Sequence, residues 1–243
     1  MKKKIVALCL CVALAVVAIG GATLAYFTDT DEANNTFTVG NVEIKLDETD
    51  IDNPQGDRVQ ENSYKLIPGV SYVKDPTITV LKGSEDCYVR MKVTLNNASK
   101  IIAMCTDPEF AEDGPTGVED AFPLIRMINF VEKNAAKWDG IIPDNMVDTE
   151  EMLANAKYCV YDKKADTITY TFYYNDVVSA ADADAALETL FDKIEVPTWV
   201  TGEQLAALKD FQINVVAEAI QTSDNFANAD EAWAAFDAQT AQK

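Results

Sequence analysis

Apolar and polar residues alternate with a period of two in several stretches of the chain, which is the pattern of half-buried β-strands. In CYVRMKVTLN, residues 87–96, the odd-numbered side chains are apolar or cysteine and the even-numbered ones are mostly polar. FQINVVAEAIQ, residues 211–221, also predicts a strand, and its central VVA predicts burial on both faces. A third strand is predicted for TITYTFYY, residues 167–174, with one face formed by Ile168, Tyr170, Phe172 and Tyr174.

Turn residues next to these segments predict two hairpins. TITV, residues 77–80, leads through a turn at Gly83 into the strand of residues 87–96. KYCVYD, residues 157–162, is joined to TITYTFYY by the turn sequence Lys-Lys-Ala-Asp. Several short strands separated by turns favour a β-sandwich.

The middle of the chain, from about residue 99 to residue 156, changes to the apolar period of a helix. Asp148 and Glu151 resemble a capping box at the start of one such helix. We therefore expect a helical insertion that packs against the edge of the sandwich. The main apolar stripe, with spacings of 4, 3, 4 and 3 residues, consists of Leu124, Ile128, Val131, Ala135 and Trp138.

Three short additional helices are predicted from their capping residues. Thr201 with Gln204 begins one helix, and Asn228 with Glu231 begins another before AWAAFDA. DADA, residues 182–185, is interpreted as the cap of a third helix that runs through Leu187 and Leu190. The predicted fold is thus mainly β, a sandwich with a helical insertion and short helices.

The N-terminal segment is typical of a signal peptide. Three lysines at positions 2–4 precede an apolar run over residues 5–19, and small residues follow, with Thr23 at −3 and Ala25 at −1. We expect signal peptidase to cleave between Ala25 and Tyr26. Because the apolar stretch to Ala25 reaches about 20 residues, an uncleaved membrane anchor is the alternative.

Acidic residues outnumber basic ones, 40 against 20, for a net charge of −20. Removing residues 1–25 takes away three lysines, so the remaining single domain, residues 26–243, would carry 17 basic residues and a net charge of −23. Such a surface repels nucleic acid and anionic lipid. The densest acidic loop is interpreted as solvated, and the alternative is a weak calcium site formed by Asp47, Asp50, Asp52 and Asp57.

The chain contains no histidine, which excludes histidine-based zinc sites and Ser-His-Asp or Cys-His catalysis. It also contains no P-loop, GxGxxG or GxSxG motif. We therefore expect neither a cofactor nor an enzyme activity. Tyr170, Tyr173 and Tyr174 are interpreted as ordinary sheet packing, with a carbohydrate-binding platform as the alternative.

Three cysteines follow the signal segment, Cys87, Cys105 and Cys159, and an odd number cannot all pair within one chain. Cys87 lies on the apolar face of its strand and is expected to be a buried thiol. A bridge from Cys159 to either of the other two remains open.

Residues 20–46 read GGATLAYFTDTDEANNTFTVGNVEIKL, with paired glycines, an aromatic pair at Tyr26 and Phe27, and Gly40 at the start of a strand. LIPGVSYVKDPTITV, CYVRMKV and INVVAEAIQTSDNF follow later. These stretches resemble the exported TasA/camelysin-type proteins of Gram-positive bacteria, which a SipW-type signal peptidase processes. The resemblance implies a jelly-roll-like sandwich at the cell surface, where donor-strand complementation assembles biofilm matrix fibres. Some members of this family were described as proteases.

The resemblance implies that residues 26–39 act as a donor arm, a free N-terminal segment that completes a sheet by pairing as a strand. The apolar residues Phe37 and Val39 occupy odd-numbered positions, whereas the apolar residues of the strand after Gly40 occupy even-numbered ones. Backbone pairing would supply affinity, and Tyr26, Phe27, Phe37 and Val39 would fill pockets. Burying these four side chains would contribute roughly 6–12 kcal/mol. Ordering the arm would cost roughly 14–28 kcal/mol, so continuous strand pairing has to contribute as well.

Pairing of the arm within its own subunit or with a neighbour stays open at this point. The expected function is a secreted structural subunit of a surface or matrix fibre, whose partners are further copies or a related matrix subunit. One alternative is a secreted camelysin-like protease. Another is a monomeric surface adhesin or ligand-binding module.

Overall fold

The alternating segments form antiparallel strands, which confirms the mainly β class. The computed structural model describes residues 41–105, 129–132, 135–140, 156–198, 200–224 and 226–240. The strands are β1 (Ile44–Asp47), β2 (Ser71–Val73), β3 (Thr77–Val80), β4 (Ser84–Asn96), β5 (Asn129–Glu132), β6 (Trp138–Asp139), β7 (Cys159–Asp162), β8 (Thr167–Tyr174), β9 (Val178–Ala180), β10 (Ala185–Ala186), β11 (Phe191–Glu195) and β12 (Ile213–Gln221). The helices are α2 (Ala98–Cys105), η2 (Ala135–Lys137), α5 (Gly202–Ala207) and α6 (Ala229–Thr240).

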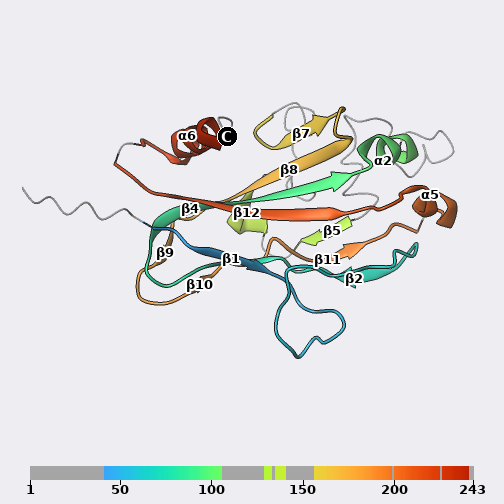
Figure 1. The fold of residues 1–243 in the computed structure, drawn as a ribbon, viewed down its shortest axis with the longest axis horizontal. Helices are drawn as coiled ribbons and strands as arrows, with labels where there is room; N and C mark the ends of the chain where they lie inside the picture. Colours follow the sequence, from blue (N-terminus) through green and yellow to red (C-terminus); the bar gives the residue numbers. More distant parts are fainter. Residues whose placement is uncertain are drawn as a thin grey trace, which may run out of the picture. The chain divides into compact units, whose positions relative to one another are not determined.

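The largest sheet has the strand order β12-β4-β8-β6, and β4 lies in its interior (Figure 1). β12 pairs with β4 without interruption from Ile213 opposite Leu95 to Gln221 opposite Cys87. On the other side of β4, β8 and then β9 continue the sheet. β7 pairs with β8 in antiparallel fashion, so the hairpin predicted around the Lys-Lys-Ala-Asp turn is confirmed.

Two smaller sheets form the second layer, with strand orders β1-β3-β10 and β2-β11-β5 (Figure 1). The predicted hairpin of residues 77–80 with residues 87–96 is wrong, because β3 pairs with β1 and β10 while β4 pairs within the large sheet. Gly83 adopts a φ of 85°, and the turn there carries the chain from one layer to the other. The jelly-roll order of strands stays a prediction.

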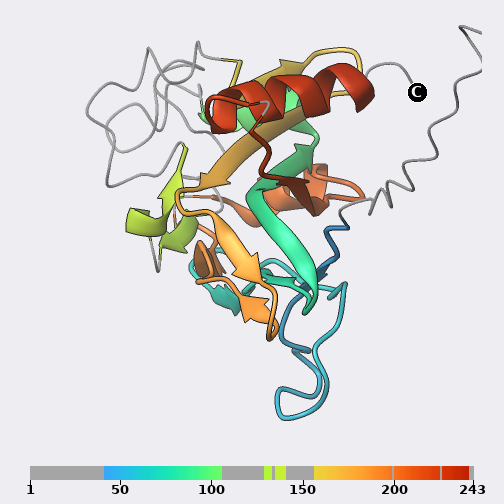
Figure 2. The same ribbon diagram turned by 90° about the vertical axis from the view of Figure 1, so that its left-hand side faces the viewer.

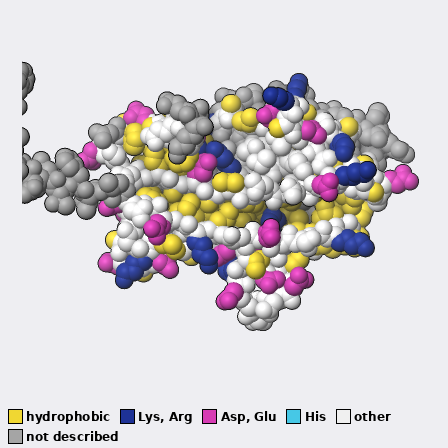
Figure 3. Space-filling model, viewed as in Figure 1, with side chains coloured by type: hydrophobic (Ala, Val, Ile, Leu, Met, Phe, Trp, Pro, Cys, Tyr) yellow, Lys and Arg dark blue, Asp and Glu magenta, His cyan; other side chains and the backbone are white. Residues whose placement is uncertain are grey.

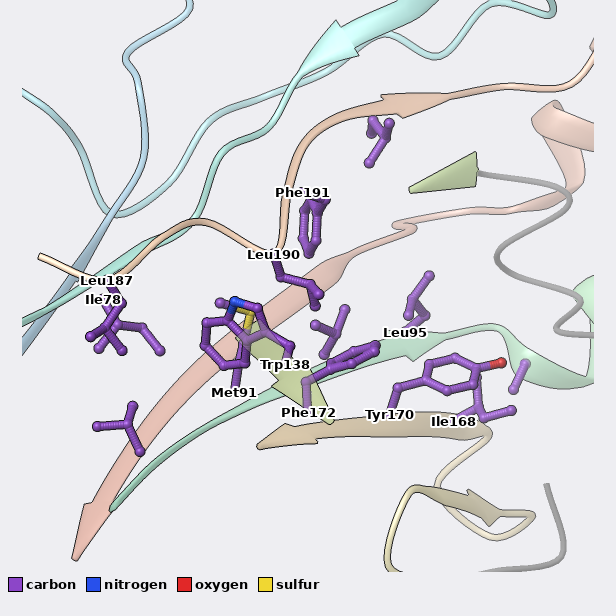
Figure 4. Packing of buried hydrophobic residues seen from close by; sticks show 14 of the residues in the cluster. Ile78, Met91, Leu95, Trp138, Ile168, Tyr170, Phe172, Leu187, Leu190 and Phe191 are labelled. Carbon is purple, nitrogen blue, oxygen red and sulfur yellow. The ribbon is translucent and has the colours of Figure 1, made fainter. Parts of the chain in front are cut away.

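The core lies between the layers and is built on the inward face of β4. All five odd-numbered side chains from Cys87 to Leu95 are 0 % exposed. Burying each large apolar side chain of this kind contributes about 1.5–3 kcal/mol. Figure 4 shows the side chains that meet β4, which include Ile78, Trp138, Ile168, Tyr170, Phe172, Leu187, Leu190 and Phe191.

The tyrosines of β8 take part in packing on both faces of the sheet. Tyr170 is 0 % exposed in the core. Tyr174 packs edge-on against Trp138, with ring centres 5.1 Å apart. Tyr173 lies on the opposite face and contacts Trp233 of α6 at 6.0 Å. Sheet packing therefore accounts for all three tyrosines.

The predicted helical stripe in the middle of the chain is wrong where the structure describes it. Val131 belongs to β5, which pairs with β11, and Trp138 belongs to β6, which pairs with β8. Strand pairing with these neighbours overrides the helical spacing of the apolar residues. Only α2 and the short η2 are helical among the described residues of this insertion. Leu124, Ile128 and the predicted Asp148 cap lie outside the described residues.

Two of the three predicted short helices are confirmed. Thr201 and Gln204 form a reciprocal capping box at α5. Asn228 accepts the backbone N–H of Glu231 at the start of α6. The third helix is wrong, because residues 185–186 form β10 and the N–H of Leu187 donates to the C=O of Ile78. Pairing with β3 buries the two leucines in the core more completely than a surface helix would.

α6 covers the outer face of the large sheet and is fastened there by Arg90 (Figure 2). Arg90 is 1 % exposed, although it lies on the face of β4 that points away from the core. Its Nε donates to Glu218 at 2.6 Å, and its two Nη atoms donate to Asp237. The guanidinium lies 4.2 Å from the centre of the Trp233 ring. The hydrogen bonds from Arg90 lower the pKa of Asp237.

Replacing Asp237 with Asn should weaken the attachment of α6 in a pH-dependent way. At pH 7 we expect a loss of about 1 kcal/mol in the free energy of unfolding, at the low end for a charged hydrogen bond because Asp237 is half exposed. A carboxyl with a lowered pKa stabilises the fold above its ordinary value of 3.8 and loses this contribution as the pH falls. Urea unfolding of both proteins should therefore differ at pH 7, and the difference should disappear only as the pH falls from 3.8 through the lowered pKa of Asp237.

Asp230→Asn is the matched control. Asp230 also lies on α6, where it pairs with Lys157, but its side chain is 73 % exposed. This variant should change the free energy of unfolding by less than about 0.5 kcal/mol. A pH-independent loss in Asp237→Asn would contradict the role assigned to its charge.

Candidate functional site

A groove of about 900 Å³ opens between the two layers beside the first half of β12. Figure 3 shows hydrophobic side chains along this boundary. The wall on the second layer is formed by the end of β1 and the segment that leads to β2. The main apolar residues that line the groove are Leu46, Leu66, Ile67, Ile194, Leu205, Leu208, Phe211, Ile213 and Val215.

The groove exists because the second layer does not extend beneath β12 at this end. Val93 and Leu95 of β4 are 0 % exposed, but their direct partners Val215 and Ile213 are only partly buried. The inward side chains are thus completely buried on β4 and only partly buried on the adjacent strand β12. The predicted burial of VVA on both faces is therefore wrong, and Val216 on the outer face is 40 % exposed.

The backbone of β12 presents one row of polar groups to this opening. Gln212 N–H donates to Asn96 Oδ1 at 2.9 Å, and Thr222 N–H donates to Asp86 O at 2.7 Å. Both bonds point toward β4, and the register between them is unbroken. Because strand backbone groups alternate in direction, the even-numbered residues of β12 pair with β4. The N–H and C=O groups of the odd-numbered residues point away from it.

The opposite wall of the groove is closed by the loop after β1. Glu48 forms an antiparallel bridge with Val59, with backbone bonds of 2.8 and 2.9 Å. The side chain of Glu48 is 6 % exposed and pairs with Lys74 at 2.7 Å. The Lys74 ammonium lies 5.8 Å from the ring of Tyr64. These contacts neutralise the charges of Glu48 and Lys74 at this wall, and the lining of the groove is a mixture of apolar and polar residues.

Arg58 holds the same loop against β1 and β3. Its guanidinium donates to the Asp47 carboxylate at 2.5 Å and to the Asp75 carboxylate at 3.0 Å. It also reaches the backbone oxygens of both aspartates and the hydroxyls of Thr49 and Thr77. Burial raises the pKa of Asp47, but the hydrogen bonds from Lys45 and Arg58 outweigh it and lower that pKa overall.

The candidate calcium ligands serve other contacts in the structure. Asp47 is occupied by Arg58, and Asp50 accepts the backbone N–H groups of residues 52 and 53. Asp52 and Asp57 have exposed side chains. In the part of the chain that the structure describes, no group of three or more Asp, Glu, Cys or His residues could hold a metal ion.

The two described thiols are separate and unbridged. Cys87 is fully buried, as predicted, and burial raises its pKa to about 11. Cys159 is partly buried, and burial raises its pKa to about 11 as well. A Cys87–Cys159 bridge is therefore not formed, and the side chain of Cys105 lies outside the described residues.

The predicted cleavage site at Ala25 and Tyr26 and the donor residues Phe27, Phe37 and Val39 also lie outside the described residues. The chain divides into two units between Val39 and Gly40, where the sequence predicts the donor arm to end. Sequence reasoning missed the open edge of β12 and the role of Arg58. The sequence gives no signal for the first, because INVVAEAIQ contains no proline, glycine, lysine or arginine and has the pattern of a central strand.

The fold and the groove define a two-layered β-protein in which the first half of β12 is only partly covered by the second layer. Residues 1–66 match the family model of the camelysin metallo-endopeptidases, which confirms the predicted resemblance over that stretch. The match includes β1 and the loop that forms the groove wall. No curated protein and no solved structure matches the chain. Among the helices that the structure describes, none is long and apolar enough to cross a membrane.

Replacing Arg58 with Gln should loosen the groove wall. Two carboxylates, which keep Lys45 and Thr49 as other partners, and two backbone oxygens would lose the donors that Arg58 supplies, and we expect the free energy of unfolding to fall by about 1.5–3 kcal/mol. Arg58→Lys should lose nearly as much, because an ammonium cannot serve both carboxylates and both carbonyls as a planar fork does. Urea unfolding measures both variants. Equal stability of Arg58→Gln and the parent protein would contradict this role.

Proposed function

We propose that the protein is a secreted structural subunit of a cell-surface or biofilm matrix fibre, which assembles by donor-strand exchange through its N-terminal segment. The observation that carries this proposal is the groove beside β12, which combines apolar and polar lining residues with a strand edge that is unpaired among the described residues. A strand needs both features, because side-chain burial alone does not offset the cost of ordering the arm. The family match over residues 1–66 supports the same proposal.

Chain length limits which residues of the arm can reach the groove within one subunit. The described chain begins at Asn41, whose C=O accepts the N–H of Glu85 at the start of β4. The end of the groove beside Thr94 lies nine residues further along β4, about 30 Å away, whereas Leu46 on its other wall is five residues from Asn41. Phe37 is four residues from Asn41 and can reach at most about 14 Å. Phe37 therefore does not reach the Thr94 end of the groove within its own subunit, whereas Tyr26 and Phe27, with a reach of about 50 Å, could enter it in either copy.

In this proposal the protein is not an enzyme, although its family model carries the name of a metallo-endopeptidase. The chain has no histidine to serve as a zinc ligand or a general base. Asp47 and Glu48, two described acidic residues that line the groove, are engaged in ion pairs with Arg58 and Lys74. Assembly as proposed requires no cofactor and no calcium.

The proposed location is the extracellular matrix or surface of a Gram-positive bacterium. Removal of residues 1–25 by a SipW-type signal peptidase would release the arm from the membrane. A net charge of −23 would keep the released subunit soluble before assembly.

Two forms of the chain test the proposed assembly, one beginning at Tyr26 and one beginning at Gly40. We expect the first to sediment as polymers and to form fibres under the electron microscope, because it can both donate and accept a strand. The second should remain a folded monomer, since the described core lies wholly within Gly40–Lys243. Monodisperse monomers of both forms, across pH and with calcium, would refute self-assembly and favour a monomeric binding module.

The absence of peptidase activity is tested with the form that begins at Tyr26. Incubation with casein should release no more peptide than buffer does, with or without added zinc or calcium. Cleavage that a chelator abolishes would refute the non-enzymatic proposal and restore the camelysin-like protease as the leading function.

A further inference from the structure

We propose that the acceptor site of each subunit is the free edge of β12, and that the arm of a second copy pairs there with the odd-numbered residues of β12. This inference rests on the proposed function and specifies its site. It follows from three observations on the described residues: the direction of the β12 backbone groups, the lack of protection along this edge, and the closure of the competing edge of β1.

The direction of the backbone groups leaves a row of hydrogen-bonding partners for a new strand. Bonds at Gln212 and Thr222 place the even-numbered residues against β4. Ile213 and Val215 therefore present their N–H and C=O groups to the opening. The side chains of Ile213 and Val215 line the groove at the same time. A paired strand would satisfy this backbone row and cover both side chains.

Nothing along β12 discourages such pairing. Soluble proteins usually protect a long edge strand with lysine, proline, a bulge or an inward charge. β12 is nine residues long, pairs with β4 without a register shift, and has Glu218 as its only charged residue. The carboxylate of Glu218 is bound to Arg90 and Lys92 on the outer face. It therefore does not protect the groove side of the edge.

The edge of β1 across the groove is a poorer acceptor. Leu81 N–H donates to Glu43 O, so the odd-numbered residues of β1 pair with β3 and the even-numbered ones point away. Of the even-numbered residues, Glu48 is already bridged to Val59. This leaves two residues, Ile44 and Leu46, beside the charged side chain of Lys45. An incoming strand finds a longer and uncharged row on β12.

The test uses two proline variants of the chain that begins at Tyr26. Val215→Pro removes an N–H that points into the opening, and an edge strand tolerates proline at such a position. It should fold and fail to form fibres. Val216→Pro removes an N–H that pairs with β4, so it should melt at a clearly lower temperature than Val215→Pro. Circular dichroism reports the fold, and sedimentation reports the assembly.

Val215→Ala is the matched control for the lost side chain, since it keeps the N–H. It should still form fibres, at a higher protein concentration than the parent chain. If Val215→Pro does not fold, Ile213→Lys replaces it, because a charge placed in the groove blocks the same site from a partly exposed position. A folded Val215→Pro or Ile213→Lys that polymerises like the parent chain would overturn the assignment to β12.

A mixing experiment then separates donor from acceptor. Val215→Pro beginning at Tyr26 keeps its arm but has no acceptor edge, and the chain beginning at Gly40 has the edge but no arm. Each alone should be monomeric, and an equimolar mixture should yield a one-to-one dimer that does not grow further. If the parent chain polymerises but the mixture stays monomeric, the acceptor site lies elsewhere. If the parent chain itself stays monomeric, the proposed function fails and this inference with it.

Discussion

The structure depends on β4, because this strand is paired along both edges and has its odd-numbered side chains completely buried. It holds β12 on one side and β8 with β9 on the other, and its inward face provides the floor of the core. Its outward face carries Arg90, which fastens α6. A strand in this position can satisfy all of its backbone groups and bury its apolar face at once. Its neighbour β12 is paired along only one edge among the described residues, and its inward side chains are only partly buried.

β12 differs from β4 in the cover it receives, although the two strands match residue for residue. Each has alternating apolar residues toward the core, but the second layer ends before it reaches Ile213 and Val215. The opposing loop is held rigidly by Arg58 and by the Glu48–Val59 bridge. The groove is therefore a built feature with fixed walls. The partly exposed side chains of Ile213 and Val215 would gain burial if a further strand entered this groove.

Local patterns in the sequence predicted the elements whose partners are close in sequence. The β7–β8 hairpin follows from alternation and a polar turn, and the caps of α5 and α6 follow from Thr201 and Asn228. Predictions failed where a distant partner decides the outcome. The local sequences of β5 and β10 have the pattern of a helix and of a helix cap. Both segments are strands because they pair with β11 and β3. The groove could not be predicted, because β12 has the sequence of a central strand and only its position makes it an edge.

The positions of arm and groove also bear on the form of the proposed assembly. The arm leaves each subunit near Glu85, whereas the groove lies beside the opposite end of β4. Two different surfaces would thus meet in every contact, and a head-to-tail contact of this kind continues into a filament unless its rotation closes a ring. Charge favours the filament, because subunits with a net charge of −23 repel one another at every additional contact. Backbone pairing along β12 is uncharged and acts at short range, so it can join subunits end to end while repulsion opposes lateral association.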